Sequence, residues 1–237
     1  MYPGEERFLA DYAEELKAAR LLDIGVGGGR TTPRFAAAVR DYIGVDYAQS
    51  MVDAVRRRFA GQLPNATFQW ADARDLGGFA DGTLDAVVFS FNGLDTLGPE
   101  ERQVFLTEAR RILRPGGLLA FSSHNLAALD LVFRFKRARS LAGLIENAKR
   151  KLIQLTRNPP LAQLLARDWA TVYDGTHGKL LKHYYVKPPA QVAALRELGF
   201  EAIRVIDTRT GAEIDAGSPA ATRVRWPYFF CRAPAGR

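Results

Sequence analysis

Short apolar runs alternate with helix-like segments along the first half of the chain, and this alternation constrains the fold more than any other feature. Two intervening segments carry helix boundary signals: a capping box at residues 50–53 and a Pro-Gly-Gly stop at residues 115–117. Because strands that alternate with helices join through right-handed crossovers, we expect an α/β fold with a parallel sheet and helices on both faces. The runs expected to be buried strands are residues 21–25, 42–46, 66–70, 85–89 and 118–122.

The same pattern resumes near the carboxyl end of the sequence. Residues 188–198 are typical of an amphipathic helix that ends at Gly199. The interval at residues 125–182 is longer than one crossover needs, and Asn158-Pro159-Pro160 interrupts it. We expect this interval to form a helical cap of two or three helices, inserted after the fifth strand and lying over the carboxyl ends of the strands. Two further strands are expected at residues 201–207 and 226–231.

Cysteine usage and hydropathy exclude several classes of protein. Cys231 is the only cysteine among 237 residues, so no intrachain disulfide forms and a reducing, cytoplasmic location is expected. No apolar run approaches the ~18 residues of a membrane-spanning helix, and the first residues lack the pattern of a signal peptide. The Asp and His residues show no metal-ligand spacing. We therefore expect no membrane partner and no metal.

The positive charge of the chain is concentrated in one segment. The formal net charge is +7, and residues 131–157 hold eight basic residues against the single acid Glu146. Such a segment can attract an anionic partner, or it can simply be a solvated helix face. The sequence leaves both interpretations open.

A glycine-rich turn follows the first expected strand and opens a helix. The residues are Asp23-Ile24-Gly25-Val26-Gly27-Gly28-Gly29, and glycines there allow a sharp turn and a close approach to a ligand. Asp46 lies 17 residues after the last glycine, at the end of the second expected strand. A carboxylate in that place can accept hydrogen bonds from both hydroxyls of a ribose, so we expect a nucleoside ligand.

These features, taken in order, resemble the class I S-adenosylmethionine-dependent methyltransferases. The resemblance covers residues 20–123 and returns weakly at residues 184–231. It implies a Rossmann-like, mostly parallel sheet of seven strands, with the last strand antiparallel and inserted beside the sixth. The matching segments are residues 22–29, Asp46, residues 71–73, residues 85–90 and residues 113–118.

The resemblance also implies roles for individual residues. Asp46 would bind the ribose and Asp72 the adenine amino group, while the glycine turn would pass under the methionine part. Arg30 replaces the third glycine of a dinucleotide fingerprint, which favours a ligand without a pyrophosphate. The positions expected to bind the cofactor S-adenosylmethionine are Asp23, Gly25, Gly27, Arg30, Asp46, Tyr47, Met51, Asp72, Ala73, Ser90 and Phe91.

Histidines at the carboxyl edge of the expected sheet are candidates for a general base. An amine acceptor needs only a neutral lone pair, whereas a hydroxyl acceptor gains from a base, most often histidine. His124 directly follows the fifth strand, and His183 with Tyr184 precedes the helix at Pro188. We expect His124 or His183 to face the acceptor, with Tyr184 nearby. Asn92 and Asp95, after the fourth strand, are further candidates for contact with the acceptor, and His177 lies in the cap.

The predicted function is S-adenosylmethionine-dependent transfer of a methyl group to an oxygen or nitrogen atom of a small metabolite, which can be anionic or carrier-linked. An RNA methyltransferase that uses the basic segment, an NAD(P)-dependent oxidoreductase and a non-catalytic nucleoside-binding protein remain alternatives. The predicted division of the chain is a cofactor-binding Rossmann-like core at residues 1–124, the cap at residues 125–182 and the remainder of the core at residues 183–237.

Overall fold

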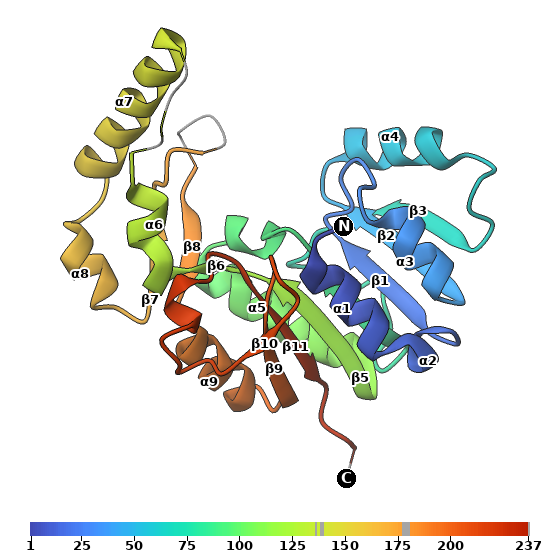
Figure 1. The fold of residues 1–237 in the computed structure, drawn as a ribbon. Helices are drawn as coiled ribbons and strands as arrows, with labels where there is room; N and C mark the ends of the chain where they lie inside the picture. The colour runs from blue at the N-terminus through green and yellow to red at the C-terminus, as the bar shows by residue number, and fades with distance from the viewer. Residues whose placement is uncertain (136, 138–139, 177–180, 237) are drawn as a thin grey trace.

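The centre of the molecule is one twisted sheet with helices on both sides (Figure 1). The structure is a computed structural model that describes residues 1–135, 137, 140–176 and 181–236. The sheet has the strand order β10-β9-β11-β5-β4-β1-β2-β3. Its parallel part consists of β1 (Arg20–Ile24), β2 (Asp41–Asp46), β3 (Ala66–Trp70), β4 (Leu84–Phe89) and β5 (Leu113–Ser122).

The remaining strands make the sheet mixed and bring its number of strands to eight. β11 (Pro227–Arg232) lies between β5 and β9 (Glu201–Asp207) and is antiparallel to both, as expected. The expected number of seven strands is wrong, because β10 (Glu213–Ile214) pairs with the outer edge of β9. Gly211 adopts a φ of +72°, which lets the chain reverse tightly enough for this two-residue pairing.

Neighbouring residues in the central strands point to opposite faces, and so the sheet has two cores. Leu21 packs with the helices on one face, and Leu22 with those on the other. The first face carries α1 (Pro3–Asp11), α2 (Ala13–Leu16) and α3 (Thr32–Ala38). The second face carries α5 (Pro99–Ile112) and α9 (Pro188–Glu197). A further helix, α4 (Gln49–Phe59), packs through Val55 and Phe59 against Val26 in the loop after β1.

The segment after β5 forms a separate small layer, which is a mixture of helices and strands rather than purely helical. Its three strands have the order β6-β8-β7, and Leu129, Phe133 and Tyr185 lie in their own apolar core. The break expected at Asn158-Pro159-Pro160 separates α7 from α8. The elements are β6 (His124–Asn125), η2 (Leu126–Ala128), α6 (Leu129–Phe133), α7 (Leu141–Thr156), α8 (Leu161–Leu165), β7 (Trp169–Val172) and β8 (His183–Val186).

The small sheet crosses the divisions predicted at residues 124 and 183. β6 continues directly from β5, and β8 leads directly into α9, so both ends of this layer join the main sheet at its carboxyl edge. In Figure 1 the layer lies beside that edge, and α7 extends away from the main sheet. Among the described residues, no helix is long and apolar enough to cross a bilayer.

Candidate active site

The glycine turn after β1 is fastened to the end of β2. Gly25, Gly27 and Gly29 have φ values of +68°, +50° and +74°, a backbone conformation that residues other than glycine rarely adopt. Asp46 accepts a hydrogen bond from the main-chain N–H of Gly27 at 2.9 Å and another from that of Ala48 at 2.9 Å. Each carboxylate oxygen keeps a second lone pair, so Asp46 can hold the turn and accept from ribose hydroxyls at once.

Asp23 lies beneath this turn and is only 1% exposed. Its carboxyl group accepts from the hydroxyl of Tyr42 at 2.7 Å and from that of Thr31 at 3.2 Å. Burial raises the pKa of Asp23 to about 7, although these two hydrogen bonds act in the opposite direction. Asp23 therefore links β1, β2 and the start of α3, and its contact with a cofactor stays a prediction.

The site expected for the adenine ring has an exposed apolar border. Tyr47 and Met51 are 75% and 44% exposed, and Trp70, at the end of β3, is 57% exposed. The indole N–H of Trp70 donates to the carbonyl oxygen of Tyr47 at 2.8 Å, which ties these two loops together. Trp70 was not among the predicted site residues. Its position at the carboxyl end of a strand was the available signal.

Asp72 and Ala73 follow β3, as expected, and an arginine engages the carboxylate. The guanidinium of Arg74 lies 2.7 Å from Asp72 and 2.6 Å from Glu101. The hydrogen bonds from Arg74 lower the pKa of Asp72, so this carboxylate is ionised at neutral pH. Ala73 is buried. An adenine amino group would have to share Asp72 with Arg74.

Arg30, which follows the glycine turn, binds helix α1. Its guanidinium makes two hydrogen bonds to the carboxylate of Glu5, at 2.5 and 2.8 Å. It also lies 5.2 Å from the ring centroid of Tyr2 and 5.3 Å from that of Phe91. Glu5 is 1% exposed and accepts from the hydroxyl of Tyr228 at 3.0 Å. Burial acts to raise the pKa of Glu5, but the interactions with Arg30 outweigh it and the pKa is lowered.

Ser90 and Phe91 follow β4 at the same edge of the sheet. Phe91 has a φ of 56° and is 52% exposed, and its ring stacks with that of Tyr2 at 5.7 Å between centroids. Tyr2 and Glu5 were missed by the sequence analysis, because nothing in the local sequence connects them to Arg30.

His124 and Asp95 form a hydrogen-bonded pair at the carboxyl end of β5. Asp95, in η1 (Gly93–Thr96), is fully buried, and its Oδ2 lies 2.7 Å from Nδ1 of His124. The same Oδ2 accepts from the main-chain N–H of His124 at 2.5 Å. Its Oδ1 accepts from the Ser123 hydroxyl at 2.6 Å and from Arg102 at 2.7 Å. Asp95 accordingly orients the ring and favours the tautomer that carries its proton on Nδ1.

The other ring nitrogen of His124 faces Asn92. Nε2 lies 3.4 Å from Nδ2 of Asn92, and the side chain of His124 is 15% exposed. Asn92 has a φ of 57°, and its N–H donates to the Ser122 hydroxyl at 2.8 Å. The side-chain oxygen of Asn92 is buried and has no hydrogen-bond partner in the described protein. An unpaired buried acceptor costs about 1–3 kcal/mol, so a ligand donor would be well placed there.

His183 belongs to a second acid–histidine pair close to the first. Its Nδ1 lies 3.1 Å from Oδ2 of Asp174, which also accepts from the Tyr185 hydroxyl at 2.9 Å. The hydrogen bond to Asp174 raises the pKa of His183. The rings of His183 and His124 are 5.5 Å apart, and the ring of Tyr185 stacks on His124 at 4.7 Å. His183 is 2% exposed, which favours a supporting role over contact with an acceptor.

Tyr184 is connected to His124 through Arg102. The ring of Tyr184 lies 4.7 Å below the Arg102 guanidinium and stacks on Trp169 at 5.5 Å. Burial raises the pKa of Tyr184, so its hydroxyl stays protonated. The structure thus brings His124, His183 and Tyr184 together, while His177 lies outside the described residues.

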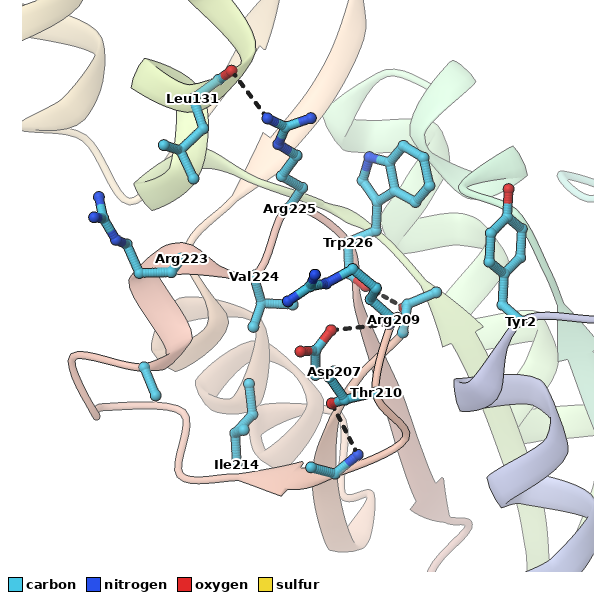
Figure 2. A pocket seen from close by; sticks show the side chains of 13 residues that line it. Tyr2, Leu131, Asp207, Arg209, Thr210, Ile214, Arg223, Val224, Arg225 and Trp226 are labelled. Carbon is cyan, nitrogen blue, oxygen red and sulfur yellow. Dashed lines mark hydrogen bonds between the residues drawn. The ribbon is translucent and has the colours of Figure 1, made fainter.

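A cavity of about 790 Å³ opens at the other side of the aromatic group around Tyr2. Trp226 lies 6.1 Å from Tyr2 and 6.1 Å from Phe91 between ring centroids. Figure 2 shows Arg209, Arg223 and Arg225 around this hollow; Arg225 donates to the carbonyl oxygen of Leu131 at 3.4 Å. No pattern in the sequence indicated this cavity. The residues that line it are Tyr2, Leu131, Asp207, Thr208, Arg209, Thr210, Ala212, Ile214, Ala220, Arg223, Val224, Arg225 and Trp226.

Part of the basic segment supports the fold of the cap. Arg150 is 8% exposed and donates to the carbonyl oxygens of Val132 and Arg134 at 3.2 and 3.0 Å. Lys151 donates to the carbonyl oxygen of Phe133 at 2.9 Å. These side chains therefore cap the end of α6. Lys136 and Arg139 of the same segment lie outside the described residues.

Comparison with known sequences finds similarity in the first half of the chain. A family model described as a methyltransferase domain matches residues 21–117. A demethylmenaquinone methyltransferase of Clavibacter sepedonicus is 33% identical over 115 residues, which cover 48% of this chain and 45% of the relative. A ubiquinone/menaquinone biosynthesis C-methyltransferase of Desulfotalea psychrophila is 29% identical over 136 residues, covering 54% and 51%. The chain spans about half the length of these curated relatives.

Solved structures share the fold over the whole chain. An S-adenosylmethionine-dependent methyltransferase from Mesorhizobium loti superposes with a TM-score of 0.66 at 17% identity, covering 97% of both chains. The CurJ carbon methyltransferase gives a TM-score of 0.60 at 16% identity and covers 98% of this chain and 54% of the other. At this level of identity the likeness concerns the fold, and it confirms the expected Rossmann-like α/β architecture.

Proposed function

We propose that the chain is a class I S-adenosylmethionine-dependent methyltransferase and that it methylates an acceptor atom that must give up a proton; the match of residues 21–117 to a methyltransferase domain supports the first part. A hydroxyl oxygen of a small metabolite is the first candidate. The observation that carries this proposal is the Asp95–His124 pair at the carboxyl edge of the sheet, where ligands bind; Nε2 of His124 lies 3.4 Å from Nδ2 of Asn92 there. An amine acceptor would need no such base.

The described residues fit the cofactor. Asp46 offers free lone pairs beside a turn that contains four glycines, and Tyr47, Met51 and Trp70 offer apolar surface for a flat ring. Bound S-adenosylmethionine would supply a methyl group already activated on a sulfonium. Asp46 would hold the ribose and Asp72 the adenine.

The protein itself would have to align the acceptor with the methyl group and receive the acceptor's proton. His124 would take the proton at Nε2, and its hydrogen bond to the Asp95 carboxyl group would stabilise the imidazolium that results. The unpaired oxygen of Asn92 would accept a hydrogen bond from a second donor group of the acceptor molecule and so orient it. We propose that residues 125–182 act as the cap that shields this step from water. Alignment of this kind can be worth an effective molarity of ~10⁵ M or more.

The cavity supports an acceptor with negative charge. Arg209, Arg223 and Arg225 lie around it, and arginine binds carboxylates and phosphates with two parallel hydrogen bonds. Trp226 adds a flat apolar wall next to Phe91. A carboxylated or phosphorylated metabolite, free or attached to a carrier, would suit these groups.

A carbon atom is the second candidate for the acceptor. The relative from Desulfotalea psychrophila is named a C-methyltransferase, and a carbon acid also needs a base before it is methylated. An RNA acceptor has less support, because Arg150 and Lys151 of the basic segment bind main-chain carbonyls. The methyltransferase domain favours methyl transfer over the oxidoreductase and the non-catalytic alternatives.

The test measures turnover in two variants of the pair, His124→Gln and Asp95→Asn. Methyl-labelled S-adenosylmethionine is first offered with carboxylated phenols, carboxylated alcohols and quinols, and kinetics follow on the acceptor that takes the label. At saturating cofactor we expect kcat to fall by about 10²–10⁴-fold in His124→Gln, with S-adenosylhomocysteine binding within about twofold of wild type. Gln103→Ala, an exposed change on α5, is the control. Unchanged kcat in both variants would refute the proposed base.

A further inference from the structure

Helix α7 turns its polar side toward the protein. Its buried residues are Arg150 and Gln154. Arg150 donates to main-chain carbonyls at the end of α6, and Gln154 donates to the carbonyl oxygen of Asp174 at 2.8 Å. A helix on the surface of a globular protein normally buries its apolar side and exposes its polar side. In α7 this order is reversed.

The outward side of α7 is a continuous apolar stripe. With 3.6 residues per turn, the positions i, i+3, i+4, i+7, i+11 and i+14 share one side of a helix. Ala148, also exposed, fills the i+7 position. The stripe, called here the α7 stripe, also holds Leu141, Leu144, Ile145, Leu152 and Leu155, which are 73%, 46%, 48%, 62% and 66% exposed. Exposed apolar surface of this extent indicates a binding partner.

Basic residues border the α7 stripe. At helical spacing the exposed Lys149 lies on one side of it, while Lys151, on the other side, is half-buried and donates to the Phe133 carbonyl. Arg137 before the helix and Arg157 after it are exposed as well. Glu146 is the only acid in residues 131–157. An apolar stripe with exposed basic residues beside it, here Lys149, Arg137 and Arg157, is the pattern of helices that lie flat in the headgroup region of a membrane.

We propose that α7 binds the surface of a membrane that contains anionic lipids, with the α7 stripe in the apolar boundary and the basic residues at the headgroups. Figure 1 shows α7 extending away from the main sheet, so a flat surface can reach it. A second copy of the chain fits less well, because two copies would bring the same positive charges together. The expectation of no membrane partner rested on the absence of a spanning segment, and surface binding does not need one. This proposal does not depend on the proposed methyl transfer.

The test is co-sedimentation of the full chain with vesicles of two compositions. Phosphatidylcholine vesicles are compared with vesicles that contain about a third phosphatidylglycerol. We expect most of the protein to sediment with the anionic vesicles at low salt, little with the neutral ones, and less with either at about 0.5 M salt. Equal sedimentation with both compositions, or none with either, would overturn the proposal.

Two variants locate the binding surface. Leu152→Glu with Leu155→Glu places charge in the stripe, and Lys149→Glu reverses a flanking charge; we expect the double variant to bind anionic vesicles at least tenfold more weakly. Val104→Glu on α5, where the side chain is 45% exposed, is the matched control and should bind as wild type. Circular dichroism confirms that each variant is folded. If the wild type instead forms a concentration-dependent dimer that the double variant abolishes, and no vesicles are bound, the partner is a second copy and the proposal is wrong.

Discussion

Asp46 has two roles that can be separated by substitution. Its oxygens already accept from the main chain at Gly27 and Ala48, which fixes the glycine turn before any ligand arrives. A turn fixed in this way does not have to be ordered when a nucleoside binds, so less affinity is lost to ordering.

Replacing Asp46 with alanine is expected to weaken binding of S-adenosylhomocysteine by about ten- to hundredfold, because hydrogen bonds to a charged acceptor are lost and the turn loosens. Isothermal titration calorimetry measures this change. Asp53→Ala, an acid on α4 that pairs only with exposed neighbours, should leave Kd unchanged. Equal Kd values for Asp46→Ala and wild type would exclude Asp46 from the cofactor site.

The order of residues along the chain predicted much of the candidate site, but not the side chains that complete it. Strand ends of a parallel sheet meet at one edge, so the glycine turn, Asp46 and His124 could be placed from sequence. Asp95 was expected to touch the acceptor, whereas it is buried and orients His124 from 29 positions away. Such a pairing depends on how β4 and β5 are packed, and no local pattern records it.

Helices α6 and α7 are joined by the side chain of a buried arginine. Arg150 donates to two carbonyl oxygens at the end of α6 that would otherwise lack partners. We expect Arg150→Met to lower the free energy of unfolding by about 1–3 kcal/mol, because both hydrogen bonds from the guanidinium to these carbonyls are lost. Urea denaturation measures the difference. Lys149→Met, its exposed neighbour, should change stability little, and equal losses in both variants would contradict this interpretation.

The long, periodic elements were predictable, and the short ones were not. The strands of the parallel sheet and helix α9 carry apolar patterns that identify them without tertiary context. β10 has two residues, and its pairing follows from the turn at Gly211 rather than from any pattern of its own. β7 and β8 have four residues each, and they become strands because Tyr185 and Val172 are buried in the small core of the cap.

The stability of the whole molecule should depend on pH through the Asp174–His183 pair. The pKa of His183 is raised above its ordinary 6.5 by Asp174, so the stabilisation is complete below about pH 6.5 and is lost as the pH rises through the raised pKa. Burial acts to raise the pKa of Asp174, but hydrogen bonds from His183 and Thr176 outweigh it and lower the pKa. The contribution of Asp174 is therefore lost only as the pH falls below about 3.8 toward the lowered pKa.

His183→Gln should accordingly cost more stability at about pH 6 than at about pH 9, because His183 loses its proton as the pH rises through its raised pKa. Chemical denaturation at both pH values gives the two differences in the free energy of unfolding. Asp23→Asn is a control with the opposite pH dependence. The pKa of Asp23 is raised to about 7, so ionisation of this buried carboxyl group lowers the stability of the wild-type protein as the pH rises from about 4 to 7. A cost of His183→Gln that is equal or larger at the higher pH would contradict the charged pair.

The chain leaves the main sheet at β6 and returns to it at β8, and these two strands are hydrogen-bonded neighbours: His124 pairs with Tyr185. An inserted segment whose first and last strands pair with each other can lengthen, shrink or be exchanged in evolution without altering the strand order of the main sheet. The half of the chain expected to bind the nucleoside can thus stay unchanged in evolution. Descendants can acquire new acceptors, and even a new location in the cell, by changes in this one inserted segment.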